Sequence, residues 1–225
     1  MARVIVRAVA LPGTPLLVPG VAGAAEVLAE SRAQALDALR ELVQGARRVV
    51  VLDCGARRAG DRRGEMRPGL EAAGVDPRWW GWAPRASAAA LPVAGVPASV
   101  ALLALAAAGW EGPVEVVELG AAPAAAAVGL VRDVLAEPGT GLVVVTGARS
   151  PLPDGAAYPA SAGAAGGSAG GASVAGGTAE DAVLRALGEA WDREARHATG
   201  EYEGRVYEVV RFRVPADEQV ATVPR

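Results

Sequence analysis

Short apolar runs alternate along the chain with longer segments whose apolar residues recur every three or four positions. Four runs predict β-strands, because they are short, rich in β-branched residues and bounded by turn residues, at 3–10, 47–53, 114–119 and 141–146. The run at 47–53 is continuous, which is typical of a parallel strand buried on both faces. A later run at 205–214 alternates in part and predicts a strand at an edge of the sheet.

Four segments have the spacing of amphipathic or buried helices, at 24–44, 97–108, 121–136 and 179–198. Gly45 follows the first segment, Pro97 opens the second, and Thr178 precedes the last as an N-cap. Strands that alternate with helices favour parallel pairing through right-handed crossovers. We therefore expect an α/β fold, a three-layer α/β/α sandwich with a mostly parallel central sheet.

The length of 225 residues suits one domain with a sizeable core, so we predict a single domain over 1–225. Residues 150–178 depart from the pattern, because they are almost entirely Gly, Ala, Ser and Pro and have no periodicity. Such a composition buries little apolar surface. We expect a flexible loop over this segment.

The composition narrows the function classes. All 22 basic residues are arginine, which is typical of a GC-rich genome and is not by itself a functional signal. The formal net charge of −3 argues against a general nucleic-acid-binding surface, which requires a basic face. The one cysteine, Cys54, excludes an internal disulfide and a cysteine-based zinc site.

Two uncharged stretches have some features of export or membrane signals. The stretch at 8–25 follows two arginines, but three prolines and three glycines interrupt it, so a buried strand and turn are favoured. In the stretch at 86–110, Pro92, Gly95 and Pro97 break the apolar run, and a buried helix is favoured. We expect a soluble cytoplasmic protein with no membrane partner.

A proline-rich turn with the sequence LPGTPLLVP follows the first predicted strand, at 11–19. An Ala-rich segment at 24–44, the run RRVVVL at 47–52 and the stretch AGWEGPVEVVE at 108–118 accompany it. Together these segments resemble the class III extradiol ring-cleavage dioxygenases, in the Ala-rich actinobacterial branch of that superfamily. The resemblance is strongest over 4–53 and 97–146 and implies the same α/β fold.

Active members of that superfamily bind Fe(II) through two histidines and a glutamate at the carboxyl ends of the strands, and another histidine acts as acid or base. In this chain the matching turns carry Gly13-Thr14 and Asp53-Cys54, and the only histidine is His197, in a polar neighbourhood near the C-terminus. One histidine cannot supply both imidazoles of a ferrous facial triad. We therefore expect a degenerate relative with no iron or other cofactor and no dioxygenase activity, which binds a small molecule or a protein.

Ligands of open parallel sheets bind beyond the carboxyl ends of the strands. That rule selects the candidate ligand-binding residues Thr14, Asp53, Cys54, Glu118, Arg149 and Ser150. They predict a polar pocket for a small hydroxylated or anionic ligand. The alternative is that Asp53 and Glu118 cap helices or pair with arginines. Cys54 is then a structural thiol, since no histidine stands near it to generate a thiolate.

Two further functions stay open. Asp53 and Glu118 would suit an enzyme of altered chemistry, either metal-dependent or hydrolytic. The loop from Arg57 to Arg67 would suit an RNA backbone; its interspersed acids and lack of aromatic residues favour a solvated loop instead. Superfamily members commonly assemble, so the resemblance also leaves a homo-oligomer open.

Overall fold

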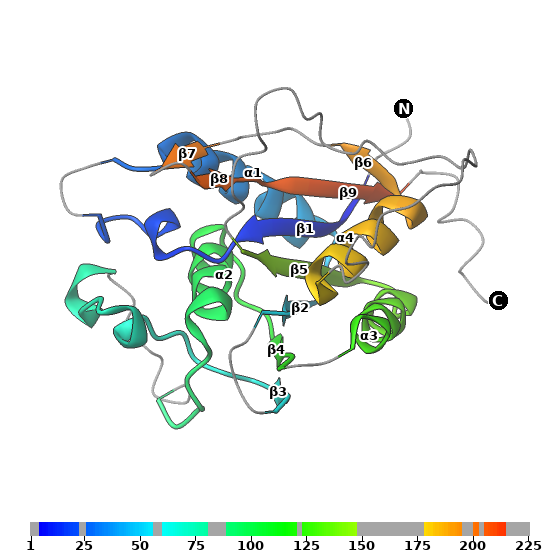
Figure 1. The fold of residues 1–225 in the computed structure, drawn as a ribbon, viewed down its shortest axis with the longest axis horizontal. Helices are drawn as coiled ribbons and strands as arrows, with labels where there is room; N and C mark the ends of the chain where they lie inside the picture. The colour runs from blue at the N-terminus through cyan, green and yellow to red at the C-terminus, as the bar shows by residue number, and fades with distance from the viewer. Residues whose placement is uncertain are drawn as a thin grey trace, which may run out of the picture.

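The computed structural model describes residues 5–22, 26–55, 60–80, 89–120, 123–147, 178–194, 200–202 and 205–214 (Figure 1). The candidates Arg149 and Ser150 lie outside these residues, as do His197, Arg57 and Arg58. The predicted flexible loop at 150–178 also lies outside them, except for its last residue.

A seven-stranded sheet forms the centre of the fold, and its strand order is β3-β4-β2-β5-β1-β9-β6. Four neighbouring strands run parallel: β4 (Val114–Glu118), β2 (Arg48–Asp53), β5 (Thr140–Thr146) and β1 (Ile5–Pro12). The other three strands each pair antiparallel with a neighbour: β3 (Arg62–Gly64) with β4, β9 (Val210–Val214) with β1, and β6 (Asp192–Glu194) with β9. β7 (Gly200–Tyr202) and β8 (Arg205–Tyr207) form a separate hairpin. The prediction of an α/β fold with a mostly parallel sheet is confirmed.

The parallel strands bury alternate side chains in two different core clusters. Val49 and Val51 join the cluster to which α1 (Ala29–Gly45) and α2 (Val96–Ala107) contribute. Val50 and Leu52 join the cluster to which α3 (Ala124–Ala136) and α4 (Ala179–Ala190) contribute. Because successive residues of a strand point to opposite faces, the continuous apolar run of β2 is explained by helices on both sides. Three short 3-10 helices complete the elements: η1 (Pro15–Leu17), η2 (Glu71–Ala73) and η3 (Pro77–Trp79).

Three helix boundaries differ from the sequence prediction by three residues or more. α3 begins at Ala124 and not at 121, with Pro123 as its N-cap. The last helix was expected to reach 198 and ends at Ala190, after which Trp191 is extended and packs on the core and β6 begins. The first helix begins at Ala29, because Leu28 adopts a left-handed conformation with a φ of 55°. None of the helices formed by the described residues combines the length and apolarity needed to cross a membrane.

The prediction that the late strand at 205–214 lies at an edge of the sheet is wrong. β9 lies between β1 and β6, because the short polar strand β6 pairs with its outer side. Arg211 of β9 is buried and its guanidinium lies 3.5 Å from the carboxylate of Glu41 on α1. An ion pair with a neighbouring helix thus allows a charged residue inside the sheet, which sequence alternation alone does not reveal.

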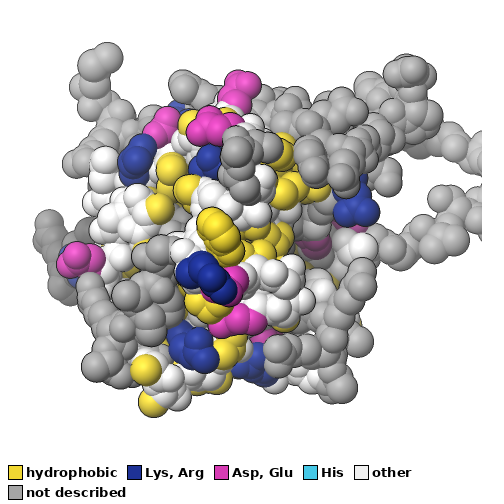
Figure 2. Space-filling view, turned by 90° about the vertical axis from the view of Figure 1, so that its left-hand side faces the viewer, with side chains coloured by type: hydrophobic (Ala, Val, Ile, Leu, Met, Phe, Trp, Pro, Cys, Tyr) yellow, Lys and Arg dark blue, Asp and Glu magenta, His cyan; other side chains and the backbone are white. Residues whose placement is uncertain are grey.

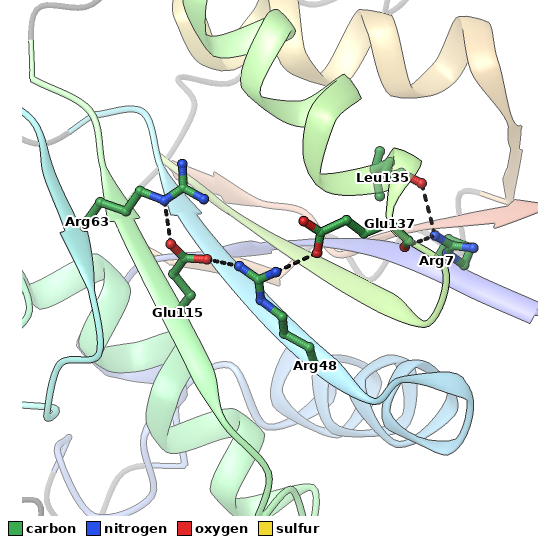
Figure 3. Close-up of polar contacts among 6 residues, drawn as sticks. All are labelled: Arg7, Arg48, Arg63, Glu115, Leu135 and Glu137. Atoms are coloured by element: carbon green, nitrogen blue, oxygen red, sulfur yellow. Dashed lines mark hydrogen bonds and ion pairs between the residues drawn. The ribbon is translucent and has the colours of Figure 1, made fainter.

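Charged side chains occupy the amino ends of the parallel strands (Figure 3). Glu115 near the start of β4 pairs with Arg63 of β3 and with Arg48 at the start of β2. Arg48 also pairs with Glu137, whose carbonyl oxygen accepts a hydrogen bond from Arg7. These ion pairs lie at the amino ends of the strands and are separate from the polar residues at the carboxyl ends.

Candidate functional site

The turn after β1 approaches its neighbours more closely than a side chain allows. A Cβ atom on Gly13 would lie 2.5 Å from Val145 Cγ1 and 2.6 Å from Pro97 Cβ. The Gly13 N–H donates to the carbonyl of Thr146 at the end of β5, at 2.9 Å. Thr14 then caps η1, where its hydroxyl accepts from the N–H of Leu16 at 3.4 Å. Glycine is therefore required at position 13 by packing.

A cavity of about 270 Å³ lies beside this turn, at the carboxyl ends of β1, β2 and β5. Its lining comes from these strand ends, from the start of α2 and α4 and from β8: Gly13, Thr14, Asp53, Gly55, Pro97, Val145, Thr146, Gly147, Glu180, Arg205 and Tyr207. Figure 2 views the molecule from the side toward which β1 and β5 point in Figure 1, and it shows acidic and basic side chains together near the centre of that face. The position agrees with the rule that ligands bind beyond strand ends.

Asp53 is the buried charged residue of this cavity. Its side chain is 3% exposed, and its Oδ1 accepts a hydrogen bond from the Gly55 N–H at 2.9 Å. Its Oδ2 is buried and has no hydrogen-bond partner among the residues that the structure describes. Burial raises the pKa of Asp53, and the nearby charge of Glu118 adds to that rise, against the opposing effect of the Gly55 hydrogen bond. A ligand that donates a hydrogen bond would satisfy this oxygen.

Glu118 is fully buried but does not line the cavity. One carboxylate oxygen lies 3.1 Å from the guanidinium of Arg62, and the other accepts the N–H of Gly95 at the start of α2. Both oxygens thus have protein partners, as expected for the structural alternative. The site uses Asp53 without Glu118.

Cys54 is half-buried, packs beside the second core cluster and does not line the cavity. Burial raises the pKa of its thiol to about 12, and the charges of Asp53 and Glu180 add to the rise. Such a thiol is mostly neutral at physiological pH, which disfavours a role as a nucleophile. The structural interpretation of Cys54 fits its surroundings.

Three of the cavity residues that were not predicted from the sequence have ionisable side chains: Glu180, Arg205 and Tyr207. Glu180 lies in the first turn of α4 and accepts the N–H of Gly147 from the end of β5, at 3.0 Å. Arg205 begins β8, and Tyr207 ends it as a buried residue. An acidic residue two positions after the N-cap Thr178 was a usable signal for Glu180. The two β8 residues reach the site through tertiary packing, which no local pattern encodes.

The arginine-rich loop contributes structure in its described part. Arg62 pairs with Glu118 and Arg63 with Glu115, and both arginines belong to β3, which the sequence prediction had placed in a loop. The Arg67 backbone bridges to Val93. Arginines that are engaged by acidic partners have less charge available for phosphates, so the RNA-binding alternative loses support.

A ferrous centre of the kind implied by the resemblance does not fit these residues. No group of three His, Cys, Asp or Glu side chains within the described ranges is placed to hold a metal ion. Glu118 is engaged by Arg62, and Val145 and Pro97 fill the space in which a side chain at position 13 would begin. In comparisons with known proteins, no family model and no curated protein matches the chain.

Proposed function

We propose that this chain is an iron-free relative of the class III extradiol ring-cleavage dioxygenases, and that its cavity binds a small molecule in the cytoplasm. The observation that carries the binding function is the Asp53 carboxylate, which is buried in the cavity wall with Oδ2 lacking a partner among the described residues. Buried polar groups in proteins are usually satisfied, and those that are not commonly face a ligand or water. The retained turn around Gly13 supports the kinship.

A cavity-filling variant tests this proposal. Gly55 lines the cavity, and among the described residues a Cβ atom there would meet the Asp53 Oδ1 alone, at an ordinary contact distance of 3.6 Å. Gly55→Leu should therefore fold and obstruct the cavity. Gly60→Leu is the matched control, because a Cβ atom at Gly60 meets nothing within 4 Å and Gly60 does not line the cavity.

The measurement is ligand-observed NMR with a panel of small polar compounds that includes catechol, glycerol and amino acids, together with elemental analysis for iron. We expect at least one compound to bind the wild type and Gly60→Leu and to lose its binding in Gly55→Leu. We also expect no stoichiometric iron in protein purified without chelators. Binding unchanged by Gly55→Leu, or one iron per chain, would contradict the proposal.

Acid–base catalysis by Asp53 is the second candidate function, favoured by the raised pKa of its carboxyl. A carboxyl of this kind exchanges a proton closer to neutral pH than an exposed one. Hydrolysis of p-nitrophenyl acetate offers a simple assay. An activity that Asp53→Asn abolishes, without loss of thermal stability, would support the enzyme over the binding protein.

A further inference from the structure

The charges around the cavity are divided between its interior and its mouth. Asp53 is 3% exposed and Glu180 is half-buried, so two carboxylates lie toward the interior. Arg205 is exposed and lines the same cavity, so we assign it to the mouth. These three are the charged side chains that line the cavity within the described part of the chain.

We propose that the cavity recognises a small amino-acid-like zwitterion, whose ammonium group lies toward Asp53 and Glu180 and whose carboxylate lies toward Arg205. The inference rests on the proposed binding function and names its ligand class. It differs from the hydroxylated or anionic ligand expected from the sequence, because the structure adds Glu180 and Arg205 to the cavity lining and does not include Glu118 in it.

The interior end of the cavity selects for a cation. An ammonium group brings three hydrogen-bond donors and a positive charge, and one donor would satisfy the Asp53 Oδ2 that lacks a protein partner among the described residues. A hydroxyl group would satisfy that oxygen but would bring no positive charge to the Asp53 carboxylate. An anion would meet the like charge of the Asp53 carboxylate, which is buried and therefore weakly screened.

The mouth of the cavity selects for a carboxylate. A guanidinium donates two parallel hydrogen bonds to a carboxylate, a geometry that a hydroxyl group does not match. The volume of about 270 Å³ limits the ligand, since it lies below the usual range of roughly 300–1,000 Å³ for pockets that hold drug-sized molecules. A short carbon chain between the two charged groups is therefore expected.

Three matched sets of compounds separate the two ends of the cavity. The first is the series of linear amino acids from glycine to 5-aminopentanoate, and the others are the alkylamines and carboxylic acids of the same chain lengths. We expect calorimetric titration at pH 7.5 to show that the tightest amino acid binds at least about tenfold more strongly than either the amine or the acid of its length. Tenfold is the smallest gain expected from one charge-assisted contact.

Side-chain variants assign each end. Asp53→Asn should weaken the amino acid and the amine alike by about tenfold or more, and Glu180→Gln should weaken both in the same sense. Arg205→Gln should remove the advantage of the amino acid over the amine. Glu189→Gln is the control for Glu180, because Glu189 is an exposed acid on the same helix that does not line the cavity. Thermal unfolding checks that each variant is folded.

The outcomes separate this inference from the binding function on which it rests. The proposed zwitterionic ligand is refuted if the carboxylic acids bind and the amines and amino acids do not. It is also refuted if no amino acid binds the wild type while catechol or glycerol binds it and loses that binding in Gly55→Leu. If no compound binds the wild type, or Gly55→Leu changes nothing, the binding function itself fails.

Discussion

Replacing Asp53 by asparagine removes one ionisable group from the cavity and leaves its shape nearly unchanged. The folded protein holds this carboxyl at 3% exposure with its Oδ2 unpartnered within the described structure, and burial raises its pKa. A carboxyl whose pKa is higher in the folded state than its ordinary value near 3.8 binds its proton more tightly when folded. The folded state therefore loses stability as the pH rises from about 3.8 through the raised pKa.

Two opposing contributions decide whether Asp53→Asn raises or lowers the free energy of unfolding. Each pKa unit of displacement corresponds to about 1.4 kcal/mol at neutral pH. Asparagine keeps an acceptor for the Gly55 N–H but loses its charge, and charged hydrogen bonds exceed neutral ones by roughly 1 kcal/mol. Burial has a larger effect on the pKa of Asp53 than the Gly55 hydrogen bond. The stability gained by removing the buried charge should therefore exceed the stability lost by weakening that hydrogen bond. We expect Asp53→Asn to be more stable than wild type at pH 7.

Denaturant unfolding of both proteins between pH 3 and pH 8 measures this difference. The gain of the variant should be largest at pH 7–8 and disappear near pH 3, where the wild-type carboxyl is protonated. At pH 7 the gain corresponds to a rise in Tm of about 2–4 °C per kcal/mol for a chain of this size. If Asp53→Asn instead loses about 2 kcal/mol at pH 7, Asp53 has a structural partner and the site proposed around it is wrong.

Three other substitutions or modifications test the remaining assignments. Glu118→Gln should lose about 1–3 kcal/mol in the same unfolding assay, since it breaks the pair with the partly exposed Arg62; a neutral outcome would return Glu118 to the list of functional candidates. Gly13→Ala should lower the free energy of unfolding by about 1–3 kcal/mol, because the added Cβ atom would contact Val145 and Pro97. Gly129→Ala is the control in a helix and should raise it by about 0.5–1 kcal/mol, since a Cβ atom there meets no described residue. Equal values for the two variants would refute the packing argument. The Cys54 thiol, with a pKa of about 12, should react with 5,5′-dithiobis(2-nitrobenzoate) at pH 8 at least about 100-fold more slowly in the native protein than in guanidinium chloride, and rapid native labelling would show a reactive thiol.

The parallel part of the fold was predictable because its signals are local. Continuous apolar strands such as β2 and β5 need only composition and length to be recognised, and helix starts such as Pro97 and Thr178 carry cap residues. The antiparallel strands β3 and β6 were missed, since each has three residues and is largely charged. Their pairing energy comes from neighbours distant in the sequence, so no local periodicity marks them.

The candidate site was predictable in position but only in part in membership. The strand-end rule selected Thr14, which lies two residues after the end of β1, and Asp53, which is the last residue of β2, and both line the cavity. It also selected Cys54 and Glu118, which are engaged in packing and in an ion pair. Sequence position specifies which strand end a residue occupies, whereas the partners that the side chain finds there depend on the whole fold.

Asp53 and Glu118 are two similar acids whose surroundings differ because Arg62, a residue distant in the sequence, pairs with only one of them. They are opposite each other in the β2–β4 register, an arrangement in which like charges repel. Arg62 from the missed strand β3 and the N–H of Gly95 engage Glu118, while the Gly55 N–H bonds to one oxygen of Asp53. Asp53, whose other oxygen has no partner in the described part of the chain, is the acid that lines the cavity. Strand β3 therefore does more than extend the sheet: by compensating Glu118 it leaves Asp53 as the acid that a ligand can satisfy.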